Sequence, residues 1–347
     1  MTGKTQYHVV VDGTDVEFDC AEGDTLLRAA LRAGLKPSYE CNSGSCGSCR
    51  YQLLTGEVRD RHPKAAGLSG RDRRKGRRLA CQSEPLSACT VRADVSSSLD
   101  VHRPVRQNAE LREIRPLTHD MAEFVFGTTN PAAFSPGQYA MVHLPDGEVE
   151  RAYSMSNVAN CHGNWRFVIK RSPDGRATSA LFDKLDIGAT VGIDAPYGNA
   201  YLRSRDHRNI VCVGGGSGIG AMISIVLGAA ALPDAGTRTV HLFIGGRTVD
   251  DIIIPSTLDL AARRLGALHI HTAVSQPDVA LAGTSGAVAR HSYEGFVHEA
   301  VAADLDSDIT DFTYYAAGPP VMTDALARLL ILERGVEADR LHFDRFY

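Results

Sequence analysis

The sequence predicts a multidomain fold in which an α+β unit, an antiparallel β-barrel and an α/β domain with a parallel sheet follow one another. Three observations predict this order. A hairpin and a helix lead into a cysteine-rich loop, alternating segments then follow between Pro/Gly turns, and an apolar strand finally runs into a glycine loop and a helix. A chain of 347 residues, 44% of them hydrophobic, is long enough to give each part its own core.

Composition excludes several classes of protein. The formal net charge of −4 argues against nucleic acid as a general partner. No apolar run approaches a membrane span and no secretory signal core precedes the first strand, so we expect a cytoplasmic protein. Four cysteines are scattered singly and are expected to be reduced thiols without a ligand role: Cys20, Cys89, Cys161 and Cys212.

The first elements form a hairpin and a short helix. Residues 7–11 and 16–18 alternate around the Asp12-Gly13 turn, which is typical of two paired strands. Asp24 or Thr25 is placed to cap a helix over residues 26–31. The cysteine loop comes directly after these elements.

The cysteine loop has the spacing Cys41-x4-Cys46-x2-Cys49, and Cys81 follows further along the chain. This is the ligand spacing of a plant-type [2Fe–2S] cluster. The small residues between the cysteines suit a loop that wraps an anionic cluster and points backbone N–H groups at its sulfurs. A zinc knuckle or a disulfide framework fits less well, because zinc sites favour two short ligand pairs.

A basic run lies just before Cys81 and contains one acid, Asp72. Two interpretations stay open: a solvated helix face, or a docking patch for an acidic redox partner. The basic residues are Arg71, Arg73, Arg74, Lys75, Arg77 and Arg78.

A polar stretch over residues 97–106 is the expected linker between a first domain, residues 1–96, and a second domain, residues 107–205. The second domain alternates polar and apolar residues in segments separated by Pro/Gly turns, which predicts an antiparallel barrel. The segments are residues 123–126, 139–144 and 165–170.

Two motifs in the second domain predict a flavin cradle. The segment Arg151-Ala152-Tyr153-Ser154 offers an arginine for a phosphate, an aromatic ring for a flat ring and a hydroxyl for a ring nitrogen. Gly175 and Thr178 open a helix whose free N–H groups suit a pyrophosphate. Taken alone, the Arg-x-Tyr-Ser segment is equally typical of an ordinary edge strand, and the Gly-x-x-Thr turn is a common helix cap. The strand ending in Val168 and Lys170 completes the expected FAD contacts.

The third domain, residues 206–347, begins with an apolar strand, a glycine loop and a helix. Gly214, Gly216 and Gly218 allow the backbone to approach a diphosphate, whose charge the helix dipole favours. Two later strands end in motifs at the edge where ligands bind an open parallel sheet. The expected contacts there are Arg247, Gly318, Pro319 and Met322.

These motifs resemble known families. The cysteine spacing, within residues 5–95, is similar to that of a β-grasp ferredoxin. The order of residues 134–139, the Arg-x-Tyr-Ser segment and the Gly-x-x-Thr turn resembles the ferredoxin–NADP reductase superfamily, in which the last two hold the flavin and its diphosphate. Gly318-Pro319-Pro320-Val321-Met322 resembles that superfamily's nicotinamide signature, with Ala317 where the family usually carries cysteine.

The whole domain order resembles the reductase components of soluble diiron monooxygenases, with toluene, alkene and isoprene monooxygenases the most similar. The resemblance implies an enzyme that passes electrons from NADH through FAD and the [2Fe–2S] cluster to a Rieske-type ferredoxin or a diiron hydroxylase. It places Phe346 and Tyr347 near the flavin ring, with Ser154 and Phe346 in the reaction centre. It also sets the adenosine ribose beside Arg247 and the pair Asp250-Asp251. An acid there can accept hydrogen bonds from a 2′-hydroxyl and repels a 2′-phosphate, which predicts NADH over NADPH; the alternative left open is that Arg247 binds the phosphate.

Other interpretations stay open at this point. A reductase of a ring-hydroxylating dioxygenase or of a sugar-deoxygenation system has the same three cofactors. A redox carrier or sensor with decayed flavin and nicotinamide domains is the non-enzyme alternative, and Ala317 is the one feature that favours it. The aromatic C-terminus is nearly as typical of a hydrophobic plug at a chain end.

The ligand spacing predicts which cysteines hold the cluster. Serine at Cys41, Cys46, Cys49 or Cys81 should abolish the cluster absorption and lower the iron content, whereas Cys89→Ser should leave both unchanged. A cluster-free variant should still reduce a two-electron dye with NADH. An essential Cys89 and a dispensable Cys81 would show that the fourth ligand is assigned wrongly.

Overall fold

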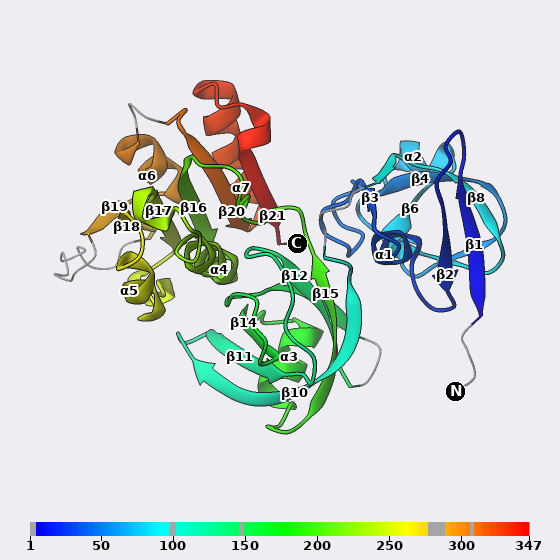
Figure 1. The fold of residues 1–347 in the computed structure, drawn as a ribbon, viewed down its shortest axis with the longest axis horizontal. Coiled ribbons are helices and arrows are strands. Elements are labelled where there is room, and N and C mark those ends of the chain that lie inside the picture. The colour runs from blue at the N-terminus through cyan, green and yellow to red at the C-terminus, as the bar shows by residue number, and fades with distance from the viewer. Residues whose placement is uncertain (1–4, 98–101, 146–148, 277–288, 306–308, 347) are drawn as a thin grey trace. The chain divides into compact units, whose positions relative to one another are not determined.

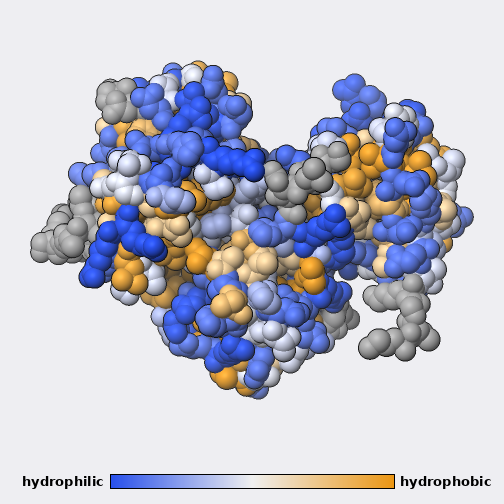
Figure 2. Space-filling view, viewed as in Figure 1, coloured by the Kyte–Doolittle hydropathy of each residue, from blue (hydrophilic) through white to orange (hydrophobic). Residues whose placement is uncertain are grey.

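The computed structural model describes residues 5–97, 102–145, 149–276, 289–305 and 309–346 (Figure 1). It divides into two compact units, residues 1–106 and 107–347. Figure 2 shows hydrophilic side chains interspersed with apolar ones over the visible surface of both units. Within the described residues, no helix is both long enough and apolar enough to cross a membrane.

The first unit is a mixed five-stranded sheet with a helix packed against it. Strands β1 and β2 form the predicted hairpin, and the side chain of Thr25 caps α1 by accepting the N–H of Arg28 at 3.3 Å. The sheet order is β2 (Glu17–Ala21), β1 (Gln6–Val11), β8 (Cys89–Arg92), β4 (Arg50–Thr55) and β6 (Arg77–Leu79). The helices are α1 (Leu26–Arg32), α2 (Gly70–Arg74) and the 3-10 turn η1 (Ala80–Gln82).

Two short antiparallel pairs complete this unit. They are β3 (Leu35–Pro37) with β9 (Val95–Ser97), and β5 (Val58–Asp60) with β7 (Ser83–Pro85). Strand β9 reaches Ser97 and the next strand begins at Val105, so the stretch expected as a linker contributes strand residues at both ends.

The second unit begins with a six-stranded antiparallel sheet that curls into a nearly closed barrel. A bridge between Met155 and Phe167 joins its two edges. The sheet order is β13 (Glu150–Ser154), β12 (Tyr139–His143), β15 (Thr190–Tyr197), β10 (Val105–Pro116), β11 (Met121–Gly127) and β14 (Asn164–Lys170). The buried Trp165 donates its indole N–H to Thr128 at 3.1 Å, and α3 (Arg176–Asp183) packs against the same core.

The rest of the second unit is a parallel six-stranded sheet with helices on both faces. Its order is β19 (Ala289–Glu294), β18 (Ala267–Val274), β17 (Thr239–Gly246), β16 (Asn209–Gly215), β20 (Phe312–Gly318) and β21 (Leu341–Arg345). One face carries α4 (Ile219–Ala229) and α5 (Thr257–Ala262), and the other carries α6 (Val297–Asp304) and α7 (Pro320–Ala327). The strand order reverses between β16 and β20, which is where such sheets bind ligands.

Helix α4 joins the barrel to the parallel sheet through small residues spaced four apart. At Gly220 a Cβ would lie 3.2 Å from the barrel's Val168, and at Gly228 it would lie 2.5 Å from a barrel proline ring. Between them, the hydroxyl of Ser224 donates to the carbonyl of Asn157 at 2.6 Å and accepts the N–H of Gly137 at 3.3 Å. Larger side chains on this stripe would push the two sheets apart.

The predicted fold class is confirmed: an α+β unit with the cysteine loop, an antiparallel barrel and a parallel-sheet domain follow in the expected order.

A group of histidines lies on the α6 face of the parallel sheet, on three neighbouring strands. His241 and His271 share a hydrogen bond of 3.1 Å between ring nitrogens, and His271 bonds Asp304 of α6 at 2.6 Å. The rings of His269 and His291 stack beside them. Burial, together with repulsion from the neighbouring imidazoles, lowers the pKa of His241 to about 3, and burial lowers that of His271 to about 4 against the opposing effect of Asp304.

These low pKa values predict acid sensitivity. An unfolded histidine binds a proton below about pH 6.5, whereas the folded pair stays neutral, so the free energy of unfolding falls as the pH drops from 6.5 toward 4. The loss should reach roughly 2 kcal/mol per histidine by pH 5. The Tm measured at pH 7 and pH 5 should therefore fall less in His241→Asn than in the unmodified protein. The exposed His162→Asn should keep the full pH dependence; equal slopes in all three proteins would contradict this account.

Candidate functional site

The four predicted cluster ligands converge in the first unit. Cys41, Cys46 and Cys49 lie in the loop between β3 and β4, and Cys81 lies in η1. Their sulfurs are close enough to hydrogen-bond in pairs: Cys46 with Cys41, and Cys49 with Cys81. The hydrogen bond between Cys46 and Cys41 lowers the pKa of the Cys41 thiol and raises that of Cys46, so the pair shares one proton. Four converging thiols fit a [2Fe–2S] cluster.

Backbone and amide N–H groups point at these sulfurs. The amides of Ser43 and Cys46 donate to the sulfur of Cys41 at 3.5 and 3.4 Å. The amide of Ser48 donates to Cys46 at 3.4 Å, and the side chain of Gln82 donates to Cys81 at 3.5 Å. Such donors stabilise negative charge on the sulfurs, as the sequence analysis expected of the backbone.

The loop needs glycine where it turns and where a second loop covers it. Gly44 and Gly47 have φ of +86° and +79°, in the left-handed region that glycine enters without strain. A Cβ at Gly47 would lie 2.4 Å from the carbonyl oxygen of Gly67, whose N–H donates to Gly44 at 2.9 Å. Sequence analysis missed Gly67, because no motif or spacing links it to the cysteines.

The single acid of the basic run organises it. The hydroxyl of Ser69 caps α2, and Ser69 and Asp72 form a capping box. The Asp72 carboxylate also binds Arg77 at 2.9 Å and Arg50 at 3.5 Å. The hydrogen bonds from Ser69 and Arg77 lower the pKa of Asp72 to about 2.

The remaining cations of the run divide into two groups. Arg73 donates to the carbonyl of Ala65 at 2.7 Å, which ties α2 to the loop beside the cysteines, and Arg78 binds Asp60 at 2.7 Å. The other three side chains are exposed and make no hydrogen bond or ion pair with any described residue: Arg71, Arg74 and Lys75. The run is therefore partly structural and partly a free basic surface.

The barrel carries the predicted flavin residues on β13. Ser154 is buried, and its hydroxyl has no hydrogen-bond partner among the described residues. A buried polar atom without a partner is unusual, and a bound ring that supplies one explains it. The ring centroids of Tyr153 and Phe167 lie 6.5 Å apart. Burial raises the pKa of Tyr153 to about 12, so the tyrosine hydroxyl stays protonated. Arg151 is exposed and bonds the carbonyl of Glu150 at 2.8 Å.

The turn before α3 is shaped as a diphosphate site requires. A Cβ at Gly175 would lie 2.5 Å from the hydroxyl of Thr178, which itself accepts the N–H of Ser172 at 3.1 Å. No side chain of the described residues caps α3, so the N–H groups of its first turn stay open to an anion. These observations fit FAD.

The glycine loop lies at the point where the parallel sheet reverses its strand order. A Cβ at Gly218 would lie 2.0 Å from the carbonyl oxygen of Ala317 at the end of β20. Gly216 has φ of +57°, and a Cβ at Gly214 would lie 2.9 Å from the first residue of α4. Within the part of the chain that the structure describes, no side chain caps α4 either. The loop can thus present its N–H groups to a dinucleotide, as predicted.

The C-terminal motif packs against this loop. A Cβ at Gly215 would lie 2.5 Å from the sulfur of Met322, and Pro319 is the N-cap residue of α7. The N–H of Phe346 donates to the carbonyl of Gly318 at 2.9 Å, and its ring packs beside the core under α4. Tyr347 lies outside the described residues.

Val168 and Lys170 of β14 lie where the barrel meets the parallel-sheet domain. Val168 packs on Gly220, and Lys170 binds Asp120 at 3.0 Å and Asp251 at 3.4 Å. Asp251 also binds Arg247 at 3.1 Å. The sequence analysis treated Asp250 and Asp251 together as candidate ribose ligands, and it did not foresee that Lys170 and Arg247 occupy the carboxylate of Asp251.

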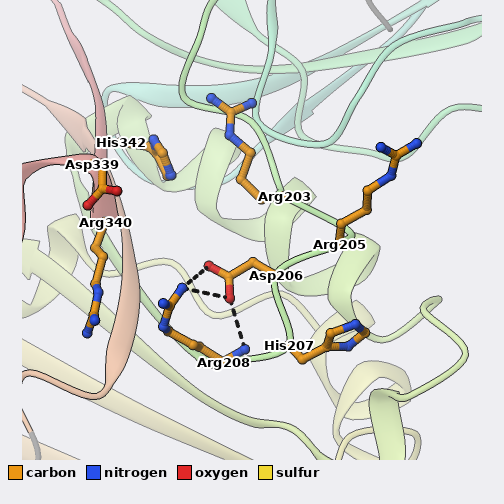
Figure 3. Close-up of a pocket in the computed structure, with 8 residues that line it drawn as sticks. All are labelled: Arg203, Arg205, Asp206, His207, Arg208, Asp339, Arg340 and His342. Atoms are coloured by element: carbon orange, nitrogen blue, oxygen red, sulfur yellow. Dashed lines mark hydrogen bonds and ion pairs between the residues drawn. The ribbon is translucent and has the colours of Figure 1, made fainter.

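A cavity of about 780 Å³ lies elsewhere, beside the first residues of β16 and β21 (Figure 3). Its basic side chains have partners inside the protein. Arg208 binds Asp206 at 3.1 Å, and Arg340 binds Glu337 at 2.9 Å. Ligands of parallel sheets bind at the opposite strand ends, so we do not assign the cofactors to this cavity.

Three family models match in the order of the sites. Residues 9–86 match a 2Fe-2S iron-sulfur cluster binding domain, residues 108–201 an oxidoreductase FAD-binding domain, and residues 212–328 an oxidoreductase NAD-binding domain. The [2Fe–2S] cluster, FAD and a nicotinamide dinucleotide are therefore the cofactors of this chain.

Curated relatives match over nearly their full length. Ferredoxin–NAD(P)+ reductase CarAd of Metapseudomonas resinovorans is 37% identical over 98% of this chain and 100% of its own. The ferredoxin–NAD+ reductase component of the alkene monooxygenase system of Xanthobacter autotrophicus is 38% identical over 95% of this chain and 97% of its own length.

A solved structure, the ferredoxin reductase in carbazole 1,9a-dioxygenase, superposes with a TM-score of 0.88 at 33% identity and covers 100% of both chains. The order of the three sites, the three domain matches and these relatives all agree. The chain therefore belongs to the family of ferredoxin–NAD(P)+ reductase components, oxidoreductases that transfer electrons through a nicotinamide, a flavin and an iron–sulfur domain.

Proposed function

We propose that this reductase takes electrons from NADH and delivers them to a Rieske-type ferredoxin or a diiron hydroxylase of an aromatic or alkene monooxygenase. The observation that carries the proposal is the joint presence of four converging cysteines, the Ser154 hydroxyl, which has no hydrogen-bond partner among the described residues, and the glycine loop at the strand reversal. The alkene monooxygenase component and the reductase component of phenol 2-monooxygenase from Pseudomonas sp. support the monooxygenase assignment. The carbazole system supports the dioxygenase alternative.

Each domain has a separate task in this proposal. Bound FAD would convert the two-electron transfer from the nicotinamide into single-electron transfers to the cluster. Arg151 and the turn from Gly175 to Thr178 hold the flavin phosphates, and the Ser154 hydroxyl bonds the flavin ring. The glycine loop, with Gly318, Pro319 and Met322, holds the nicotinamide dinucleotide. Phe346 covers the ring from the chain end.

We further propose the division into residues 1–96, a linker over 97–106, residues 107–205 and residues 206–347. The strand reversal within 206–347 and the closing bridge of the barrel support the last two. Cytoplasmic location is proposed because all eight cysteines are free thiols or candidate ligands.

The free basic surface of α2 is the proposed docking site for the acceptor. Arg71, Arg74 and Lys75 have no partner among the described residues, and Arg73 ties their helix to the loop beside the cysteines. An acidic protein that binds there gains charge attraction without displacing an internal ion pair. Since the attraction is between exposed groups, it should weaken with salt.

The flavin assignment predicts the effect of removing its phosphate ligand. Arg151→Ala should weaken FAD binding roughly tenfold to a hundredfold, because a charge-assisted hydrogen bond is lost. The dissociation constant follows from flavin fluorescence on dilution. The exposed barrel variant Arg112→Ala is the matched control and should bind FAD normally. Equal affinity in the two variants would exclude Arg151 from the cradle.

The docking surface predicts a separation of two activities. Arg71→Glu combined with Arg74→Glu should slow reduction of an acidic Rieske-type ferredoxin at least severalfold while NADH-dependent ferricyanide reduction is kept. Salt should slow the unmodified protein in the same assay. Lys36→Glu combined with Arg112→Glu makes the same change in net charge elsewhere and should have little effect. Equal slowing by both pairs would mean that net charge, not this surface, directs the acceptor.

A further inference from the structure

Four charged groups meet where the barrel packs against the parallel sheet. Asp120 and Lys170 come from the barrel, and Arg247 and Asp251 come from the segment after β17. Lys170 lies 3.0 Å from Asp120 and 3.4 Å from Asp251. Arg247 lies 3.1 Å from Asp251 and 3.7 Å from Asp120. We call these four residues the interface network. Its two cations and two acids balance in charge.

Asp251 is the most enclosed member of the interface network. Its side chain is only 4% exposed, and its carboxylate accepts the backbone N–H of Arg247 at 3.0 Å in addition to the guanidinium. Although burial opposes ionisation, the bonds from Arg247 hold the pKa of Asp251 well below its usual range. The carboxylate is therefore a fixed anion whose oxygens are already engaged by cations.

The interface network lies beside the glycine loop. A Cβ at Gly216 would lie 3.8 Å from the side chain of Lys170, and Gly245, two residues before Arg247, pairs in register with Gly215. Arg247 thus follows the strand adjacent to the dinucleotide loop, on the ligand-binding edge of the sheet. An adenosine ribose bound to this edge would have the network as its neighbour.

We propose that Asp251 sets the coenzyme preference by occupying Arg247 and Lys170, the two cations that would otherwise bind a 2′-phosphate. A 2′-phosphate would have to compete with a buried carboxylate for the same donors, and it would bring its charge next to Asp251 and Asp120. A free 2′-hydroxyl carries no charge and avoids that competition. Asp251 is then a positioning residue that acts through Arg247, not a ligand of the ribose. The inference rests on the proposed use of NADH.

The test compares two probes that differ only in the 2′-phosphate: adenosine 2′,5′-bisphosphate and 5′-AMP. Titration calorimetry on the holoprotein measures both without hydride transfer. Asp251→Asn should tighten the bisphosphate roughly tenfold or more, because two cations are released, and should change 5′-AMP less than threefold. Adding Arg247→Gln to Asp251→Asn should remove the gain. A purely structural role of Asp251 would weaken both probes together and overturn the proposal.

Further variants keep the outcome decisive if Asp251→Asn folds poorly. Asp120→Asn leaves the bonds between Asp251 and Arg247 intact and should give a smaller gain in affinity, for the bisphosphate alone. If neither Asp120→Asn nor Asp251→Asn binds the bisphosphate more tightly, the proposal is overturned. The exposed Asp259→Asn controls for net charge and should change neither probe. A gain in Asp250→Asn without one in Asp251→Asn would assign the discrimination to Asp250 instead. If steady-state kinetics of the unmodified protein favour NADPH, the proposed donor fails, while the ratio of the two probes still tests Asp251.

Discussion

The close packing of helix α4 and its N-cap Gly218 against the end of β20 and against the barrel is the constraint on which both dinucleotide-binding domains depend. At its start, Gly218 touches the carbonyl of Ala317 and so fixes the distance between β16 and β20. Further along, Gly220 and Gly228 let the same helix press against the barrel. A methyl group at Gly218 would separate the strands, and one at Gly228 would move the barrel. One helix therefore sets both the width of the dinucleotide loop and the position of the flavin domain beside it.

Buried carboxylates organise the cations in both units. Asp72 gathers Arg77 and Arg50 in the first unit, and Asp251 gathers Arg247 and Lys170 in the second. In each case the acid is almost enclosed while its arginine partners stay partly exposed. The acid determines which cations are held and which remain free for other contacts. Charge density along the sequence is thus a poor guide to the charge a partner meets.

The sequence predicted the fold class and the cysteine ligands because their signals are local. The spacing of Cys41, Cys46 and Cys49 lies within one loop, and the alternation of each barrel strand is read within a few residues. Gly67, Ser224 and the pairing of Asp251 could not be predicted, because each acts through a contact between distant segments. Asp251 and Lys170 are 81 residues apart in the sequence, and no periodicity of the sequence relates them. The basic run shows the same limit, since only the fold reveals which of its cations are paired.

Ala317 has a chemical consequence of its own. Ala317 is 1% exposed, and its carbonyl packs against Gly218 of the glycine loop, at the position where the resemblance to the superfamily's nicotinamide signature leads to the expectation of cysteine. Cys212, on the neighbouring strand, is completely buried, and burial raises its pKa. Among the described residues at the glycine loop and the end of β20, the partly exposed sulfur is therefore the thioether of Met322, and no exposed thiol lies there. Oxidation beside the dinucleotide loop would therefore give a methionine sulfoxide, which reductases reverse, and would leave no thiol there to form a sulfinic acid or a disulfide.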